Sequence, residues 1–236
     1  MKTELKSLRD SLDIRVKVTE KYGTPEEYLT NHYPPNYFDF FIDVGTRGTF
    51  NPWHINNIGK ENPETTCFGF EPDTPYYKEL VEEIQKENLS NVILHMEGMG
   101  NGEPIPTPQG GGSTVTLAQI FKRYKLDPKK KWMIKYDCEG CELALMNPKC
   151  SECLELLKQA EHIAFEIHDN KCGKNYFTTN NYLPEQLDGV ENWLHDSLSE
   201  THTSFLTCED TGCKTYVFLS DEIMKEKDNL FWQELI

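Results

Sequence analysis

Residues 131–146 read KWMIKYDCEGCELALM and contain one complete strand-to-helix transition. The apolar run at the start is typical of a buried strand, which we expect at 131–137. The acids after it lead into a predicted helix at 140–146, because helix N-termini tolerate acids. A strand followed directly by a helix is half of a βαβ unit, so this stretch predicts an α/β fold.

The rest of the chain repeats this alternation. Four more apolar runs predict strands, at 37–44, 64–72, 91–98 and 162–168. Helical patterns lie between or after them, at 74–88, 116–126 and 151–159. Alternation of this kind predicts a mostly parallel sheet in which every strand's C-terminal end lies on one edge.

Three further segments complete the predicted order of elements. Thr74 is the predicted N-cap of the helix at 74–88, and Pro75 is its predicted first helical residue. The Gly- and Pro-rich stretch 98–112 predicts a long irregular connection. After a helix at 183–196, strands at 204–208 and 214–220 are expected to close the chain as an antiparallel pair.

The length of the chain indicates its domain organisation. With 236 residues, the chain is expected to form one domain over 1–236, with an amphipathic helix at 3–22 inside an N-terminal extension at 1–36. We expect the core at 37–168 and a C-terminal part at 169–236.

The net charge of −15 disfavours nucleic acid as a partner, because phosphates need clustered Lys and Arg. No apolar run of membrane-spanning length and no signal-peptide core occur, so we expect a cytoplasmic protein without a membrane partner.

Acids follow four of the five core strands, at the edge where α/β sheets bind ligands. A turn with Gly45 follows the first strand, and Glu71 follows the second, 28 positions after Asp43. An acid at that place accepts hydrogen bonds from both ribose hydroxyls of a nucleoside cofactor. The turn lacks the full G-x-G-x-x-G of a pyrophosphate site, which favours S-adenosylmethionine over NAD. The alternatives are a plain tight turn and a surface Glu before Pro72.

These motifs together resemble the FkbM-type S-adenosylmethionine-dependent methyltransferases. The resemblance runs from FIDVGTRGTF through FGFEPD, STVTLAQI and WMIKYDCEGCELALM to AFEIH, over about residues 38–168. It implies a Rossmann-like seven-stranded fold, a cofactor-binding core, an acceptor site shaped by the C-terminal part, and methyl transfer to an oxygen, most often of a sugar or glycan. The family's first turn has Asn where this chain has Arg47, and here Gly48 comes one position early. The implied cofactor-binding residues are Asp43, Gly45, Thr46, Arg47, Gly48, Glu71, Pro72, Glu97, Gly98 and Asp137.

Methyl transfer to a hydroxyl needs a group that removes the hydroxyl proton. A carboxylate or imidazole within hydrogen-bond reach does this. The candidates at the strand ends are Asp137, Glu139, Glu166 and His168, of which we favour Asp137 and His168. The alternative for His168 is a core histidine bonded to a backbone carbonyl.

A metal ion is a second possibility at the same edge. Asp137, Asp169 and Asn170 resemble the ligands of catechol-type O-methyltransferases, which have an Asp after one strand and Asp-Asn after the next. Oxygen ligands suit Mg²⁺ or Mn²⁺, which would hold the acceptor hydroxyl and lower its pKa. This suggests a metal-dependent O-methyltransferase acting on a non-sugar small molecule as the runner-up. Asp169-Asn170 as a simple loop start is the alternative.

Eight cysteines include two pairs with zinc-like spacing. The pairs are Cys138 with Cys141 and Cys150 with Cys153. A zinc-stabilised, non-catalytic binding module is therefore a competing hypothesis. We favour reduced thiols, with Cys138 and Cys141 as small buried hydrophobic residues, because a four-cysteine site would need separate elements to converge.

Overall fold

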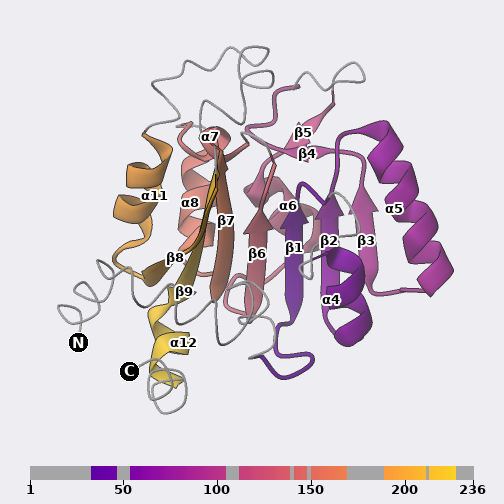
Figure 1. Cartoon of the computed structure of the whole chain (residues 1–236), viewed down its shortest axis with the longest axis horizontal. Helices are drawn as coiled ribbons and strands as arrows, with labels where there is room; N and C mark the ends of the chain where they lie inside the picture. The colour runs from indigo at the N-terminus through magenta and orange to yellow at the C-terminus, as the bar shows by residue number, and fades with distance from the viewer. Residues whose placement is uncertain are drawn as a thin grey trace.

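A computed structural model describes residues 33–46, 54–104, 112–138, 141–147, 150–168, 189–210 and 213–226. Seven of its strands form one sheet (Figure 1): β1 (Phe40–Val44), β2 (Thr66–Phe70), β3 (Val92–His95), β6 (Trp132–Tyr136), β7 (His162–His168), β8 (His202–Asp210) and β9 (Cys213–Ser220). Their order across the sheet is β3-β2-β1-β6-β7-β9-β8. The predicted N-terminal helix at 3–22 lies outside the described residues.

Strand directions confirm the predicted mostly parallel sheet. The five strands β3, β2, β1, β6 and β7 are mutually parallel, and β9 pairs antiparallel with both β7 and β8. The arrowheads of the parallel strands all lie at the upper edge in Figure 1. The chain runs outward from β1 to β2 and β3, then returns to place β6 on the other side of β1. The upper edge between β1 and β6 is therefore the topological switch point, where α/β sheets bind ligands.

Helices flank the sheet: α4 (Ile55–Glu61), α5 (Thr74–Glu87), α6 (Leu117–Tyr124), α7 (Glu142–Leu145), α8 (Ser151–Leu157), α11 (Val190–Leu198) and α12 (Asp221–Glu226). The sequence did not predict α4 or α12, and the N-cap of α5 is Asp73 rather than Thr74. Part of the expected irregular stretch forms β4 (Gly98–Met99), which pairs with β5 (Thr114–Val115). No helix in the described part of the chain is long and apolar enough to cross a membrane.

The two faces of the sheet pack into separate cores because side chains alternate along each strand. Phe40, Ile42 and Val44 of β1 join a large cluster with the residues of α6 and α8. Phe41 joins a second cluster on the opposite face, together with Met133 of β6. All five residues of β1 are buried, as expected for a strand covered on both faces.

The alternation that buries Phe41 and Met133 also aligns the polar residues that follow them. Asp43 lies two positions after Phe41, and Lys135 lies two positions after Met133, so both side chains point to the face of the smaller cluster. Asp43 and Lys135 are direct partners in the parallel ladder. The sheet thus carries a charged pair inside its core, one step before the strand ends.

Candidate functional site

Strand register brings three predicted site residues together at the switch point. Val44 pairs with Phe70 on one side and with Tyr136 on the other. Each predicted site residue, Gly45, Glu71 and Asp137, directly follows one of these paired residues in the chain. The three residues therefore leave adjacent strands at the same level of one edge.

Gly45 forms a tight turn against the end of β6. Its φ is +77°, and its N–H donates to the carbonyl of Phe70 at 3.0 Å. A Cβ placed on Gly45 would collide with the carbonyl oxygen of Asp137 and lie 2.7 Å from the carbonyl carbon. Only glycine fits both the left-handed φ and this close approach.

A buried chain of charges connects the first strand to the site. Asp43 has no exposed surface, and its two carboxylate oxygens accept hydrogen bonds from the Thr46 hydroxyl and from Lys135 Nζ, the latter at 3.3 Å. Lys135 Nζ also lies 3.4 Å from Asp137 Oδ2. Asp43 and Thr46 bond to each other, and their predicted contact with a cofactor stays a prediction. Asp43 and Asp137 together hold the ammonium of Lys135.

The ammonium of Lys135 stays charged despite its burial. Desolvation lowers the pKa of Lys135, but attraction by Asp43 and then Asp137, with hydrogen bonds to both, outweighs it and raises the pKa above the usual value. A permanently charged ammonium between two carboxylates fixes one oxygen of Asp137. The other oxygen, Oδ1, faces His168.

Among the described members of the predicted catalytic set, His168 is the most deeply buried, at 3% side-chain exposure. Its Nδ1 lies 3.2 Å from Oε1 of Glu142, which is also buried. Nδ1–H can donate to this carboxylate, which orients the ring with Nε2 toward the strand ends. Nε2 points toward Asp137 Oδ1 at 3.8 Å and Glu166 Oε1 at 3.6 Å. The structure thus brings Asp137, Glu166 and His168 together, as expected for neighbouring strand ends.

Glu71 lies at the place where a ribose-binding acid is expected. It is buried, at 5% exposure, and its Oε1 accepts the backbone N–H of Asp73 at 2.7 Å. Pro72, beside it, is half-buried. Glu71 is therefore not the surface acid of the alternative interpretation, although a cofactor contact stays a prediction.

Two other predicted cofactor residues, Glu97 and Gly98, are engaged within the protein. Glu97 forms a bidentate ion pair with Arg123, at 2.6 and 3.3 Å, and the Arg123 hydrogen bond is the main cause that lowers the pKa of Glu97. The N–H of Gly98 donates to the carbonyl of Ser113 in the pairing of β4 with β5. Arg47, Gly48, Glu139, Asp169 and Asn170 lie outside the described residues.

The cysteines differ from the prediction. Cys138 and Cys141 are joined in a disulfide, with a Cα–Cα distance of 5.6 Å, and both are only half-buried against the large core cluster. The expectation of two buried free thiols is therefore wrong, because three-residue spacing at this turn brings the two sulfurs within bonding reach. The separate pair Cys150 and Cys153 is buried, and the hydrogen bond from the Cys150 thiol is the main cause that lowers the pKa of Cys153 to about 6. Among the described residues, no four-cysteine cluster forms.

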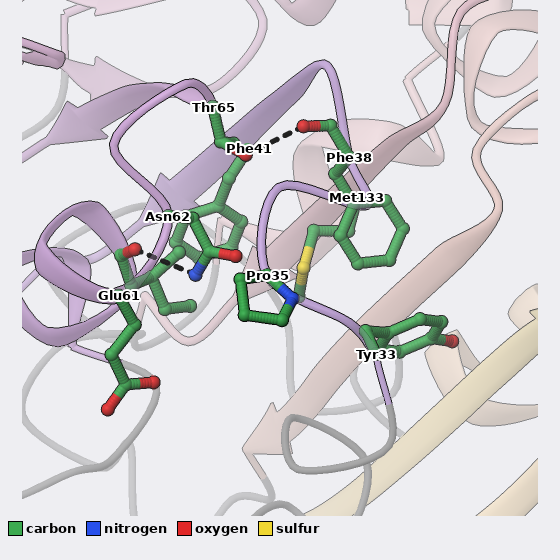
Figure 2. Close-up of a pocket in the computed structure, with 9 residues that line it drawn as sticks. Tyr33, Pro35, Phe38, Phe41, Glu61, Asn62, Thr65 and Met133 are labelled. Carbon is green, nitrogen blue, oxygen red and sulfur yellow. Dashed lines mark hydrogen bonds between the residues drawn. The ribbon is translucent and has the colours of Figure 1, made fainter.

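A small pocket lies far from these residues, near the N-terminal ends of β1 and β6. Figure 2 shows Tyr33, Pro35, Phe38 and Met133 around it. Its volume is about 70 Å³, well below the ~300 Å³ of typical ligand pockets. A nucleoside cofactor does not fit there, so this pocket is not the candidate active site.

Lys135 and Glu142 lie in the quoted stretch KWMIKYDCEGCELALM, but neither residue had a role predicted from the sequence. Lys135 could have been found from its spacing, two positions before Asp137 on the same strand face. Glu142 had no such signal, because its contact with His168 joins α7 to β7 across 26 positions.

The solved structures to which this chain is similar include three methyltransferases. A SAM-dependent methyltransferase from Aquifex aeolicus is 14% identical, with 93% of this chain and 98% of that chain covered and a TM-score of 0.44. The O-methyltransferase TomG from Streptomyces achromogenes, solved with SAM, is 12% identical, with 88% and 77% covered and a TM-score of 0.44. A human methyltransferase 10 domain containing protein is 13% identical, with 93% and 98% covered and a TM-score of 0.45.

Comparison with protein-family models gave no match, and comparison with curated protein sequences gave no significant match. At the identities and TM-scores of the solved structures, the likeness carries no argument about reaction or substrate. The resemblance to FkbM-type enzymes therefore stays a prediction that rests on the motifs.

Proposed function

We propose that this protein transfers a methyl group from S-adenosylmethionine to a hydroxyl oxygen, in the manner of the FkbM-type enzymes its motifs resemble. The observation that carries the proposal is the meeting of Gly45, Glu71 and Asp137 at the switch point. A glycine turn after the first strand and an acid after the second are features of α/β sites that bind a nucleoside at the switch point.

The described residues fit the cofactor in chemical terms. Glu71 offers buried carboxylate acceptors for the two ribose hydroxyls. Gly45 allows backbone to approach a ligand without a side chain between them. The sequence of the first turn lacks the full G-x-G-x-x-G of a phosphate cradle, which favours a cofactor that carries no phosphate.

S-Adenosylmethionine supplies a sulfonium methyl group; as the acceptor oxygen bonds to its carbon, the sulfur–carbon bond breaks and sulfur keeps the electron pair. The residues of this chain must orient the acceptor and take its proton. Asp137 and Glu166 have side-chain exposures of 29% and 25%, so an acceptor can reach them. His168 lies behind them, which makes Asp137 or Glu166 the direct proton acceptor and His168 a positioning group.

The acceptor we propose is a hydroxyl of a sugar or glycan. Its support is the resemblance and the charge of −15, which disfavours RNA and anionic membrane surfaces as partners. A metal-dependent enzyme for a non-sugar small molecule is the runner-up, with Mg²⁺ or Mn²⁺ on Asp137, Asp169 and Asn170. Of these three residues the described chain includes only Asp137. The zinc-module alternative loses support because Cys138 and Cys141 form a disulfide.

A methyl-transfer assay tests the proposal. The full chain is incubated with S-adenosylmethionine and a panel of sugars, glycans, small phenols and RNA, and S-adenosylhomocysteine formation is measured. We expect product with a hydroxyl acceptor and at least about a 100-fold loss in Asp137→Asn, the usual scale of general-base catalysis. Asp39→Asn is the matched control, because Asp39 lies just before β1 at the opposite edge. Equal turnover in both variants would remove Asp137 from the mechanism.

A further inference from the structure

We propose that Asp137, Glu166 and His168 form a binding site for one divalent first-row metal ion, with Glu142 holding His168 in the ligating orientation. This ligand set differs from the predicted set of Asp137, Asp169 and Asn170. It rests on contacts among described residues from β6, β7 and α7.

The distances suit a shared ion better than direct hydrogen bonds. Nε2 of His168 lies 3.8 Å from Asp137 Oδ1 and 3.6 Å from Glu166 Oε1, beyond the ~3.2 Å upper range of N–H···O bonds. Two ligands at about 2.1 Å from one ion can lie up to ~4.2 Å apart. One ligand atom from each of the three residues lies within 4.8 Å of the others. A small inward movement of the carboxylates completes the coordination.

The surroundings of His168 match those of a metal-binding histidine. Such a histidine donates its other ring N–H to a carboxylate, which fixes the tautomer and ring orientation. Nδ1 of His168 lies 3.2 Å from buried Glu142, so Nε2 is left facing Asp137 and Glu166.

The charge of the site also favours a bound cation. Asp43, Glu142, Asp137 and Glu166 contribute four carboxylates to the described part of the site, and Lys135 contributes one ammonium. The formal charge is −3 when all five groups have their ordinary ionisation. Asp43 and Glu142 are buried, whereas Asp137 and Glu166 are partly exposed, so this group of carboxylates attracts a cation to its exposed side.

The ligand types indicate the class of ion. Imidazole favours first-row transition ions, whereas carboxylates suit Mg²⁺ and Mn²⁺, so the mixed set fits an ion such as Mn²⁺. The partial exposure of Asp137 and Glu166 leaves room for an acceptor oxygen on the ion. Lowering the pKa of an acceptor hydroxyl is the role that follows, and this role rests on the proposed function.

Manganese titration tests the site directly. The full chain is treated with a chelator and titrated with Mn²⁺, while electron paramagnetic resonance follows the free ion. We expect one Mn²⁺ per chain, no specific binding in Asp137→Asn or His168→Gln, and affinity weakened about 10- to 100-fold in Glu142→Gln.

His162→Gln is the matched control, because His162 is buried and begins the strand that His168 ends. The two residues lie roughly 20 Å apart along the strand. Glu166→Gln alters a partly exposed side chain, so it tests the site even if His168→Gln fails to fold. Absence of binding by the wild type, or equal affinity in His168→Gln and His162→Gln, would overturn the inference and leave His168 as an ion-paired core residue.

A parallel titration with S-adenosylhomocysteine separates this inference from the proposed function. Binding of S-adenosylhomocysteine without Mn²⁺ binding would contradict the metal site and leave the methyltransferase proposal standing. Binding of Mn²⁺ in a protein that never binds S-adenosylhomocysteine would support the metal site and contradict the proposed function.

Discussion

The backbone carbonyl of Asp137 occupies the space where a side chain on Gly45 would lie. The Asp137 N–H also donates to the Val44 carbonyl at 3.0 Å, so the ends of β1 and β6 are locked at one level. Because Asp137 carries the proposed chemistry, a change at Gly45 should affect both stability and activity.

Gly45→Ala should destabilise the protein by about 3 kcal/mol, combining the left-handed strain and the forced displacement of Asp137. Urea denaturation measures this loss. Gly102→Ala is the control, since Gly102 also has a positive φ, of +83°, but its added Cβ has no neighbour closer than 3.9 Å. Gly102→Ala should lower the stability only by the strain of the positive φ, about 1–2 kcal/mol. Equal losses in both variants would show that the contact with Asp137 does not matter.

Lys135→Met should be strongly destabilising. The substitution leaves Asp43 and Asp137 without their shared cation, and breaking a buried ion pair from one side costs about 3–5 kcal/mol. Lys60→Met is the comparison, because Lys60 pairs with Glu87 at the surface and is 64% exposed. Little change in stability is expected there, because solvent and salt screen an exposed ion pair. If the Lys135→Met protein were as stable as the Lys60→Met protein, the contacts of Lys135 with Asp43 and Asp137 would not contribute to stability as described.

Glu71→Ala should weaken S-adenosylhomocysteine binding by on the order of 2 kcal/mol, by loss of charged hydrogen bonds to the ribose. Isothermal titration calorimetry measures the affinity. Glu87→Ala is the control, because Glu87 lies at the far end of α5 and is 41% exposed. Unchanged affinity in Glu71→Ala, with a normal fold, would exclude Glu71 from the cofactor site.

Stability should fall as the pH drops below about 6.5, partly because of His202. Burial is the main cause that lowers the pKa of His202 below its ordinary 6.5. Its Nε2–H donates to the Ala160 carbonyl, and Nδ1 lies 2.8 Å from the Thr201 hydroxyl oxygen, but the burial of the ring outweighs these contacts and disfavours its charged form.

Below pH 6.5 the unfolded chain therefore takes up a proton that the folded chain resists. The stability from this group is complete above that pH and declines toward the lower folded-state pKa. Melting temperatures at about pH 7.5 and 5.5 should show the decline, and His202→Gln should reduce it. A variant with the same pH dependence as the wild type would assign the effect to other groups.

Elements with strong local signals were predictable from the sequence. β1 (FFIDV) and β7 (HIAFEIH) are mainly apolar, and the five parallel strands follow from strands that alternate with helices. α4 was missed because it has only seven residues, two of them asparagines and one a glycine, and its buried Ile55 and Ile58 are too few to show a period.

The sequence predicted only those site residues whose positions follow from the ends of the strands. Asp137, Glu166 and His168 meet because adjacent parallel strands end at one edge. The bond of Glu142 to His168 depends on packing between elements, which no local pattern encodes, whereas the position of Lys135 on the same strand face as Asp137 can be read from their spacing. The Cys138–Cys141 disulfide was missed because the same spacing also suits a zinc ligand pair or two free thiols.

The most direct test of the central claim is calorimetric titration of the full chain with S-adenosylhomocysteine, with and without Mn²⁺. We expect one site of micromolar affinity in the wild type that is weakened in Glu71→Ala and retained in Asp137→Asn. Absence of binding under both metal conditions, in a folded protein, would contradict the assignment of the switch-point site to a methyltransferase.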